Sequence, residues 1–572
     1  MSAATVTSTP SLPINPSYPS LDAKALGALK LACRMAREQD DWSKGGELSP
    51  AWDRWSGYPY MAKFTYDLTF NVRMLAKVAA QVPAWREVVV DAMDRIVARN
   101  FTYAAFFDWV EQKGLDPNAG RYPYFYYKHF IPPGMAGVYN APGYAGNGHG
   151  TQWAGMVGSL MLGPALQNNR HPYFPPHSPG VGREYNPDPI YGCGSSNMMF
   201  RGYFLEQIGL LRAVSGDDKY EGPFTFVYDE EWQFTYTARE IAEGMDNQFR
   251  APLDSNGSPL RGGIDCEVGK AFPACIAVGG LGLHLYRNTT GIDLTAGFEE
   301  WLAWAMDHII AGGGPPDGPF EWVAPYYDRD LGYCMNLPQH QVPLFWTCGA
   351  AHLIPHAPEY ARRMYEGAIK QFGVHDPKHD DLRLIHHPAV AGDLKIEDIW
   401  GTSSAIACAH EFGDTERLEQ FLRWTERAWQ PIEADGEYAY HFNLGEPWPR
   451  GIPNHFAQMA FIGDAGSLSS IYGVPDARRH SEPTVVGIDY PSVTLAQAHY
   501  DRERRELIVA LVPGRGQAPS RTPTHFEVIN VDPAAITVRC DGAPHDCETV
   551  GRDRIRISTT VAPHAFTVTR GF

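Results

Sequence analysis

Two cysteines close together in the chain are the sharpest candidates for chemistry. The segment GGIDCEVGKAFPAC contains Cys266 and Cys275, with Glu267 directly after the first thiol, and a glycine-rich apolar helix pattern follows. A helix that begins between two thiols can turn both toward one cavity, and a helix N-terminus lowers the pKa of a nearby thiol. The pattern indicates a thiol acid/base or nucleophile pair, although most free cysteines are small buried core residues.

A second group combines carboxylates with aromatic side chains. In DDWSKGGELSPAWDRWSGYPYMAKFTYDLTF, Asp41 and Trp42 lie in a loop, while Phe64, Tyr66 and Asp67 fall at the start of the next helix pattern. A carboxylate surrounded by aromatic rings has a raised pKa and can act as a general acid or base near neutral pH. For any single aspartate, helix capping or a solvated loop is the commoner explanation.

Four more residues are candidates for lining the same pocket. Asn197 and Tyr203 lie in the helix pattern SSNMMFRGYFLEQIG, Phe272 lies between the two cysteines, and His340 follows a proline at a predicted helix start. Tyr203 could donate or accept a proton, whereas a core tyrosine with a satisfied hydroxyl is equally ordinary. No cysteine pair has the spacing of a zinc motif, so we expect no metal ion.

Helices are expected to position these residues. Apolar residues recur near i, i+3, i+4 and i+7 in twelve segments: 22–38, 60–81, 84–99, 197–214, 231–247, 271–287, 295–311, 342–354, 357–372, 396–412, 414–430 and 453–471. Turns of one type (SGDDKY, TGIDLT, FGDTERL) join several of them, with glycine ending one helix and Asp or Thr near the next start. Short turns make antiparallel neighbours, so we expect six hairpins closed into an (α/α)6 toroid, with an open superhelical array as the alternative.

Three parts of the chain depart from the helical pattern. Residues 1–21 form a polar leader rich in proline and serine. Residues 112–192 are crowded with glycine, proline and aromatics, which indicates either a lid over a site or an arm for oligomer contacts. From residue 481 the hydrophobic period becomes two, which predicts a C-terminal antiparallel β-sandwich-like domain over 481–572. The catalytic toroid is then expected over 22–475.

The amino-acid composition indicates which partners and which cellular location to expect. The 572 residues carry 48 Lys+Arg and 66 Asp+Glu, a net charge of −18 without a basic stripe, so we expect no nucleic-acid partner. The chain shows no run of about 18 apolar residues and no signal-peptide pattern. Its nine scattered cysteines form no disulfide framework, which favours a reduced, cytoplasmic protein without a membrane span. Its 15 Trp, 29 Tyr and 27 Phe suit a wide, apolar-walled pocket.

The segment DCEVGKAFPAC resembles the cysteine motif of the linalool dehydratase/isomerase family. In that family two cysteines at this separation face the substrate, and glutamate follows the first, as Glu267 does here. SPAWDRWSGYPYMAKF, and NMMFRGY followed by LLRAVSGDDKYE, resemble further family segments in the same order. The resemblance covers roughly residues 22–473 apart from the 112–192 insertion, and the β tail has no counterpart.

The resemblance implies an (α/α)6 toroid, cofactor-independent chemistry and a ring-shaped homo-oligomer. The family removes water from a tertiary allylic alcohol and interconverts allylic isomers, which implies a small apolar hydroxylated substrate. Cys266 and Cys275 would be the thiol pair, and Asp41 corresponds to the family's loop aspartate. Phe64 and Tyr203 stand where the family has tyrosine and histidine.

Because Phe64 and Tyr203 replace the family's tyrosine and histidine, two of the family's polar groups are missing here. We expect Tyr66, Asp67 and Tyr203 to supply polar groups in their place.

Two other functions fit the same elements. Helical toroids followed by β-sandwiches are common among polysaccharide lyases and glycosidases, which would need an Asp/Glu pair ~5–10 Å apart across the funnel and no cysteine. A non-catalytic assembly protein would use the aromatic insertion as its interface.

Overall fold

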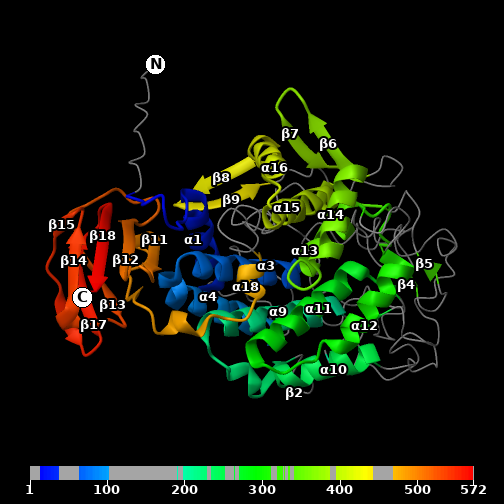
Figure 1. Ribbon diagram of the computed structural model, residues 1–572, viewed down its shortest axis with the longest axis horizontal. Coiled ribbons are helices and arrows are strands. Elements are labelled where there is room, and N and C mark those ends of the chain that lie inside the picture. Colours follow the sequence, from blue (N-terminus) through cyan, green and yellow to red (C-terminus); the bar gives the residue numbers. More distant parts are fainter. Residues whose placement is uncertain are drawn as a thin grey trace, which may run out of the picture.

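The computed structural model describes most of the helical part of the chain and the C-terminal strands (Figure 1). The described residues are 13–37, 63–101, 190, 198–227, 233–250, 263–264, 270–310, 318–325, 327–328, 333–334, 341–386, 395–428, 430–441 and 468–570. The leader up to residue 12 and the 112–192 insertion, apart from Ile190, lie outside them.

Helices dominate the described residues before Gly473, as the periodicity predicts. They are α1 (Ala23–Arg37), α3 (Lys63–Gln81), α4 (Arg86–Ala98), α9 (Met198–Ser215), α10 (Ala238–Arg250), α11 (Pro273–Thr290), α12 (Ala296–Ala305), α13 (Pro343–Leu353), α14 (Pro358–Phe372), α15 (Lys395–Phe412), α16 (Thr415–Ala428) and α18 (Leu468–Tyr472). Of the helix expected at 453–471, the structure describes only the end, as α18.

One helix begins later than its hydrophobic pattern predicts. The start of the expected 231–247 helix is a strand, β2 (Gln233–Tyr236), which pairs with β1 (Phe224–Val227). A capping box then starts α10: the amide of Glu240 donates to Thr237 Oγ1 (3.2 Å), and the Glu240 carboxylate accepts from the amide of Thr237 (2.8 Å). Local capping therefore sets the helix start, seven residues beyond the expected one.

The three glycine turns adopt the predicted conformation. Gly216, Gly291 and Gly413 have φ values of +74°, +79° and +65°, in the left-handed region that favours glycine. The amide of Gly291 donates to the carbonyl of Arg287 (2.8 Å), which closes the last turn of α11. These turns confirm the predicted helix ends.

Six helices pack one against the next through the middle of the helical body. α3 packs on α9, α9 on α11, α11 on α13 and α13 on α15, while the short α18 contacts both α15 and α3. Every residue of α13 is buried, whereas α10, α14 and α16 each bury only one face. The first group therefore forms an inner layer that the amphipathic helices cover.

Glycines allow the inner helices α9 and α11 to approach closely. A Cβ at Gly202 would lie 2.7 Å from the backbone nitrogen of Gly279, and one at Gly282 would lie 3.0 Å from the Gly202 carbonyl oxygen. The glycine-rich stretch of α11 is thus a packing surface for α9, and it brings Tyr203 of α9 toward the start of α11.

Short strands that the sequence analysis does not predict connect several helices. They are β3 (Lys270–Ala271), β4 (Tyr327–Asp328) and β5 (Tyr333–Cys334) in one sheet, the hairpin of β6 (Gly373–Asp376) with β7 (Asp381–Leu384), and the hairpin of β8 (Gln430–Ala434) with β9 (Glu437–His441). β3 leads directly into α11.

The C-terminal residues form two antiparallel sheets, as the period of two predicts. One has the order β10 (Thr484–Val486), β13 (Pro523–Ile529), β17 (Arg554–Thr560) and β16 (Glu548–Gly551). The other has the order β11 (Val493–Asp501), β12 (Glu506–Pro513), β18 (His564–Arg570), β14 (Ile536–Cys540) and β15 (Ala543–Pro544). The buried rings of Phe526 in β13 and Phe566 in β18 pack 5.1 Å apart, so the two sheets share apolar contacts.

The helical body and the C-terminal sheets are in direct contact. The buried Trp85, just before α4, donates its indole N–H to the carbonyl of Leu495 in β11 (2.9 Å), and the amide of Leu21 donates to Ala496 (2.7 Å). Among the described residues, no helix has both the length and the apolar character needed to cross a membrane.

Candidate active site

Three of the expected site residues have described side chains: Tyr203, Phe272 and Cys275. Phe64, Tyr66 and Asp67 lie in the first turns of α3, as predicted, but only their backbone is described. The remaining candidates lie outside the described residues: Asp41, Trp42, Asn197, Cys266, Glu267 and His340.

Cys275 lies in the first turn of α11. Phe272 is the extended N-cap residue (φ −93°, ψ 118°), Pro273 is the first helical residue, and the Cys275 side chain is half-buried. Proline suits this position because the first helical N–H has no partner within the helix. The expectation that a helix begins between the two cysteines is confirmed, and it places one thiol where α11 starts.

Tyr203 of α9 points its hydroxyl into the interior of the helical body. The residue is only 2% exposed, its ring packs edge-on against Phe70 of α3 (6.0 Å), and its hydroxyl oxygen lies 3.5 Å from Nε2 of His352. The same hydroxyl is within hydrogen-bonding reach of the Cys348 thiol. Tyr203 therefore meets two polar side chains of α13.

Cys348 and His352 are the site residues that the sequence analysis does not select. They lie four positions apart on one face of α13, with the Cys348 sulfur 4.0 Å from both ring nitrogens of His352. Nδ1 of His352 lies 3.3 Å from the carbonyl oxygen of Ala274, the residue before Cys275. If Nδ1–H donates to that carbonyl, Nε2 is the acceptor that faces Tyr203. The C-x-x-x-H spacing in PLFWTCGAAHL, which places both side chains on one face of a helix, could have pointed to this pair from the sequence.

Burial keeps this group of side chains uncharged. It lowers the pKa of His352 well below 6.5, with the Arg73 cation acting in the same direction. It raises the pKa of the Cys348 thiol to about 12 and that of Tyr203 well above 10. The Cys275 sulfur is near enough to act electrostatically on both Tyr203 and Cys348, in the direction that raises their pKa values. We call Tyr203, Cys275, Cys348 and His352 the polar cluster.

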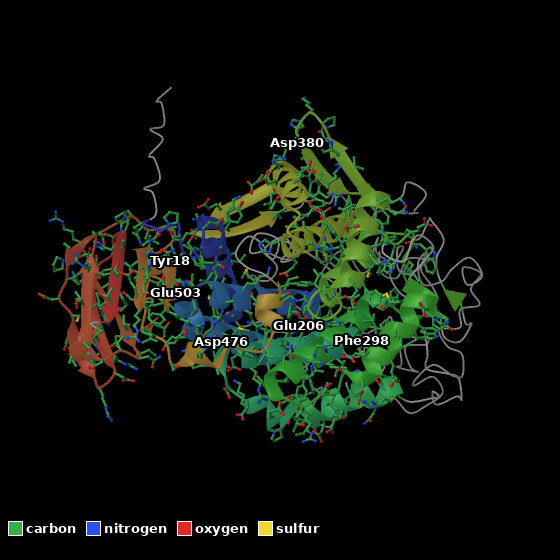
Figure 2. All side chains as sticks on the ribbon, in the orientation of Figure 1. Tyr18, Glu206, Phe298, Asp380, Asp476 and Glu503 are labelled. Atoms are coloured by element: carbon green, nitrogen blue, oxygen red, sulfur yellow. The ribbon has the colours of Figure 1, made fainter. Side chains whose placement is uncertain are left out.

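A buried ion pair lies beside the polar cluster. Arg73 of α3 binds Glu206 of α9 through two hydrogen bonds, and these side chains are 3% and 0% exposed. The hydroxyl of Tyr472 in α18 also donates to Glu206, which Figure 2 shows in the middle of the helical body. The Arg73 guanidinium lies 5.5 Å from the Tyr203 ring. Glu206 is therefore paired with a buried cation, and the guanidinium of that cation, Arg73, also packs against the ring of Tyr203.

The six cysteines whose side chains are described are free thiols: Cys33, Cys275, Cys348, Cys408, Cys540 and Cys547. Chemistry at Cys275 or Cys348 would therefore be thiol chemistry.

Comparison with known proteins identifies one family. No curated protein matches the chain significantly. The family match covers slightly less than half of the 572 residues and includes Cys266 together with the whole polar cluster, while Asp41 and Asp67 lie before it. Residues 180–444 match the linalool dehydratase/isomerase family, which confirms over this segment the resemblance that the cysteine motif carries.

Proposed function

We propose that this protein is a cofactor-independent dehydratase or isomerase of a small apolar allylic alcohol. One observation carries the proposal: the family match contains Cys266 and Cys275, and the helix start that bears Cys275 lies against Tyr203, Cys348 and His352 in one buried cluster. The match itself supports a function of the dehydratase/isomerase kind.

The electrostatics of the polar cluster suit an uncharged substrate. The pKa shifts of Tyr203, Cys348 and His352 all favour the neutral side chain. A charged substrate buried beside them would lose its hydration without gaining an ionic partner, at a cost on the order of several kcal/mol. A neutral alcohol needs only hydrogen bonds. When the Tyr203 hydroxyl donates to Nε2 of His352, its oxygen still has lone pairs that can accept a hydrogen bond from the substrate hydroxyl.

Elimination requires an acid for the departing oxygen, because hydroxide is a poor leaving group. We assign this role to Asp41, with Asp67 as a second carboxylate at the start of α3. The thiolate form of one cysteine of the Cys266–Cys275 pair then takes a proton from the neighbouring carbon, or first forms a C–S bond with the allylic cation. In the second case the C–S bond breaks as the Asp41 carboxylate, left after it has protonated the departing oxygen, takes the proton from the neighbouring carbon. The aromatic residues Trp42, Phe64, Tyr66 and Phe272, with Asn197, Glu267 and His340, are proposed to line the substrate pocket.

The packing order supports the proposed architecture. The succession α3–α9–α11–α13–α15–α18, in which α18 contacts both α15 and α3, is what the inner layer of an (α/α)6 toroid requires. We propose that this toroid spans 22–475 and carries the site, and that the two C-terminal sheets form a β-sandwich over 481–572. A ring-shaped homo-oligomer with reduced, cytoplasmic thiols belongs to the same proposal, and light scattering on the purified protein tests the subunit number.

The direct test is an assay of the purified protein with linalool and related allylic alcohols, with the diene and the isomeric alcohol measured by gas chromatography. Cys266→Ala and Cys275→Ala should each lower turnover by about 10²–10⁴-fold, the usual contribution of a positioned acid or base. Cys547→Ser is the matched control, because its thiol is exposed in the C-terminal part of the chain. Unchanged turnover in both alanine variants, with native circular dichroism, would contradict the proposal.

A further inference from the structure

Three side chains able to bind a metal ion converge in the C-terminal sheets. Cys540 is the last residue of β14, Asp541 follows it in the turn to β15, and His564 is the first residue of β18. Among the residues that the structure describes, they are the one group of three potential ligands whose atoms all lie within 4.8 Å of one another.

Two of the three distances between the ligand atoms match the edges of a metal tetrahedron. The Cys540 sulfur lies 3.7 Å from Nδ1 of His564 and 3.6 Å from Oδ2 of Asp541, and the latter two atoms are 2.9 Å apart. Usual zinc bond lengths at tetrahedral angles give edges of about 3.6 Å for both sulfur pairs and about 3.4 Å for N···O. Only the His564–Asp541 pair has to open, by about 0.5 Å.

The outer atoms of two ligands are held by neighbouring groups. Nε2 of His564 lies 3.2 Å from Oγ1 of Thr560, and Oδ1 of Asp541 accepts the amide of Ala565 (2.9 Å). Without an ion, Nδ1 of His564 donates to Oδ2 of Asp541 (2.9 Å), and a metal ion would take the place of that proton while Nε2 keeps its contact with Thr560. Metal sites commonly orient their ligands by such outer hydrogen bonds.

The backbone fixes the third ligand and the turn. Cys540 pairs with Phe566 in the β14–β18 ladder, and the amide of Asp541 donates to the carbonyl of Ala565 (2.8 Å). Asp541 and Gly542 have φ values of +52° and +83°, a left-handed pair that forms a tight hairpin turn. The ligand-bearing backbone is therefore pinned on both sides before any ion binds.

We propose that Cys540, Asp541 and His564 bind one divalent transition-metal ion. One sulfur, one oxygen and one nitrogen form a ligand set that suits Zn²⁺, whereas Ca²⁺ and Mg²⁺ prefer oxygen ligands alone. Because Asp541 is exposed, water fills the fourth position. The ion fastens the β14–β15 turn to the start of β18.

This site is separate from the polar cluster. In Figure 1 the strands β14 and β18 lie at the left end of the molecule, whereas α11 and α13 lie within the helical body to the right. The site departs from the sequence expectation of no metal, which considered only pairs of cysteines. Its ligands come from a turn and from a strand 24 residues later.

The test uses the full-length protein, stripped with a chelator, dialysed and titrated with Co²⁺ and then Zn²⁺. We expect one equivalent of cobalt to produce a thiolate-to-cobalt absorption band with intense tetrahedral d–d bands, and zinc to abolish both. Cys540→Ser should remove the charge-transfer band, and His564→Gln should weaken binding by at least the 10–100-fold that loss of an outer hydrogen bond causes. Cys547→Ser, which removes an exposed thiol seven residues away, should bind like the wild type.

Absence of stoichiometric cobalt binding to the wild type would overturn the proposal, as would a charge-transfer band that survives in Cys540→Ser. A band lost in Cys547→Ser but kept in Cys540→Ser would assign the metal elsewhere. If Cys540→Ser does not fold, Thr560→Val replaces it, because this change leaves all three ligands in place. A 10–100-fold weaker affinity in Thr560→Val then supports the site, and wild-type affinity contradicts it.

Discussion

At the scale of single residues, the polar cluster shows how burial selects chemistry. Desolvation keeps His352 unprotonated and Cys348 and Tyr203 protonated, so the described part of the site offers donors and acceptors without net charge. Such a surface can hold an alcohol through hydrogen bonds. It leaves protonation of the departing oxygen to a carboxylate outside the cluster, which is the role proposed for Asp41.

His352 should matter for turnover. His352→Gln removes the acceptor that faces the Tyr203 hydroxyl, and we expect kcat/KM for the allylic alcohol to fall by about 10²-fold, the lower end of the range for a positioned proton acceptor. His356→Gln is the matched control: His356 stacks on His284 (4.1 Å) instead of contacting Tyr203. Equal losses in the two variants would indicate a folding effect and contradict a role for His352 at the site.

The hydroxyl of Tyr203 can be tested by two substitutions. Tyr203→Phe removes the group that bonds to His352 and Cys348, and it should lower kcat/KM by at least about 10-fold, which corresponds to one lost hydrogen bond. Tyr203→His introduces the residue found at this position in the family motif and keeps a hydrogen-bonding side chain. We expect it to be more active than Tyr203→Phe, and the reverse order in steady-state assays would rule out a polar role for this position.

At the scale of helices, close contact of α9 with α11 is a requirement of the fold. A Cβ at Gly202 would meet backbone atoms of Gly279 at 2.7 and 2.9 Å, which cannot move aside, whereas one at Gly209 would meet the flexible side chain of Leu285. Gly202→Ala should therefore lower the free energy of unfolding by about 1–3 kcal/mol, as overpacking does. Gly209→Ala, on the same helix, should cost less. Urea unfolding measures both, and a larger loss for Gly209→Ala would refute this packing argument.

The ion pair between α3 and α9 is a second requirement at this scale. Glu206→Gln leaves the Arg73 cation buried without its partner, which should lower the free energy of unfolding by about 3–5 kcal/mol. Tyr472→Phe keeps the ion pair and removes only a hydrogen bond to a charged group, worth about 1.5–3 kcal/mol. Thermal and urea unfolding should rank the two variants in this order. Equal stability of Glu206→Gln and wild type would show that the pair contributes nothing.

At the scale of the whole molecule, buried histidines should make stability depend on pH. Burial lowers the pKa of His284 from 6.5 to about 4, and lowers those of His352 and His356 well below 6.5. The unfolded chain then binds more protons, so stability falls as pH drops below 6.5 and is constant with respect to these groups above it. His284 alone should cost about 2 kcal/mol at pH 5.

The measurement is the free energy of unfolding at pH 7.5 and pH 5, for the wild type and for His284→Gln. The variant should lose less stability between the two pH values, because its side chain does not titrate. An identical pH dependence in the two proteins would contradict the assignment of His284 to this effect.

Local patterns along the chain were enough to predict most of the helices and the C-terminal strands. The 3.6-residue period found the helices, the left-handed glycines at 216, 291 and 413 ended them, and the period of two found the C-terminal strands. The start of a helix before Cys275 was predictable for the same reason, since its signals lie within a few residues. Where local signals compete, as at the capping box of Thr237 and Glu240, the hydrophobic pattern alone misplaced the helix start.

Contacts between distant segments could not be obtained in this way. Tyr203 and His352 are 149 residues apart in the sequence. They meet because α9, α11 and α13 pack closely through glycines, and the hydrophobic period of a helix does not show which other helix a glycine will contact. The pKa shifts arise from that burial, and the meeting of Cys540 with His564 arises from strand pairing. The cysteine motif and the flanking segments that follow the family's order indicated the family, and the resemblance implied the kind of reaction. Packing determined which neutral side chains stand beside Cys275, because burial and proximity exist only in the folded chain.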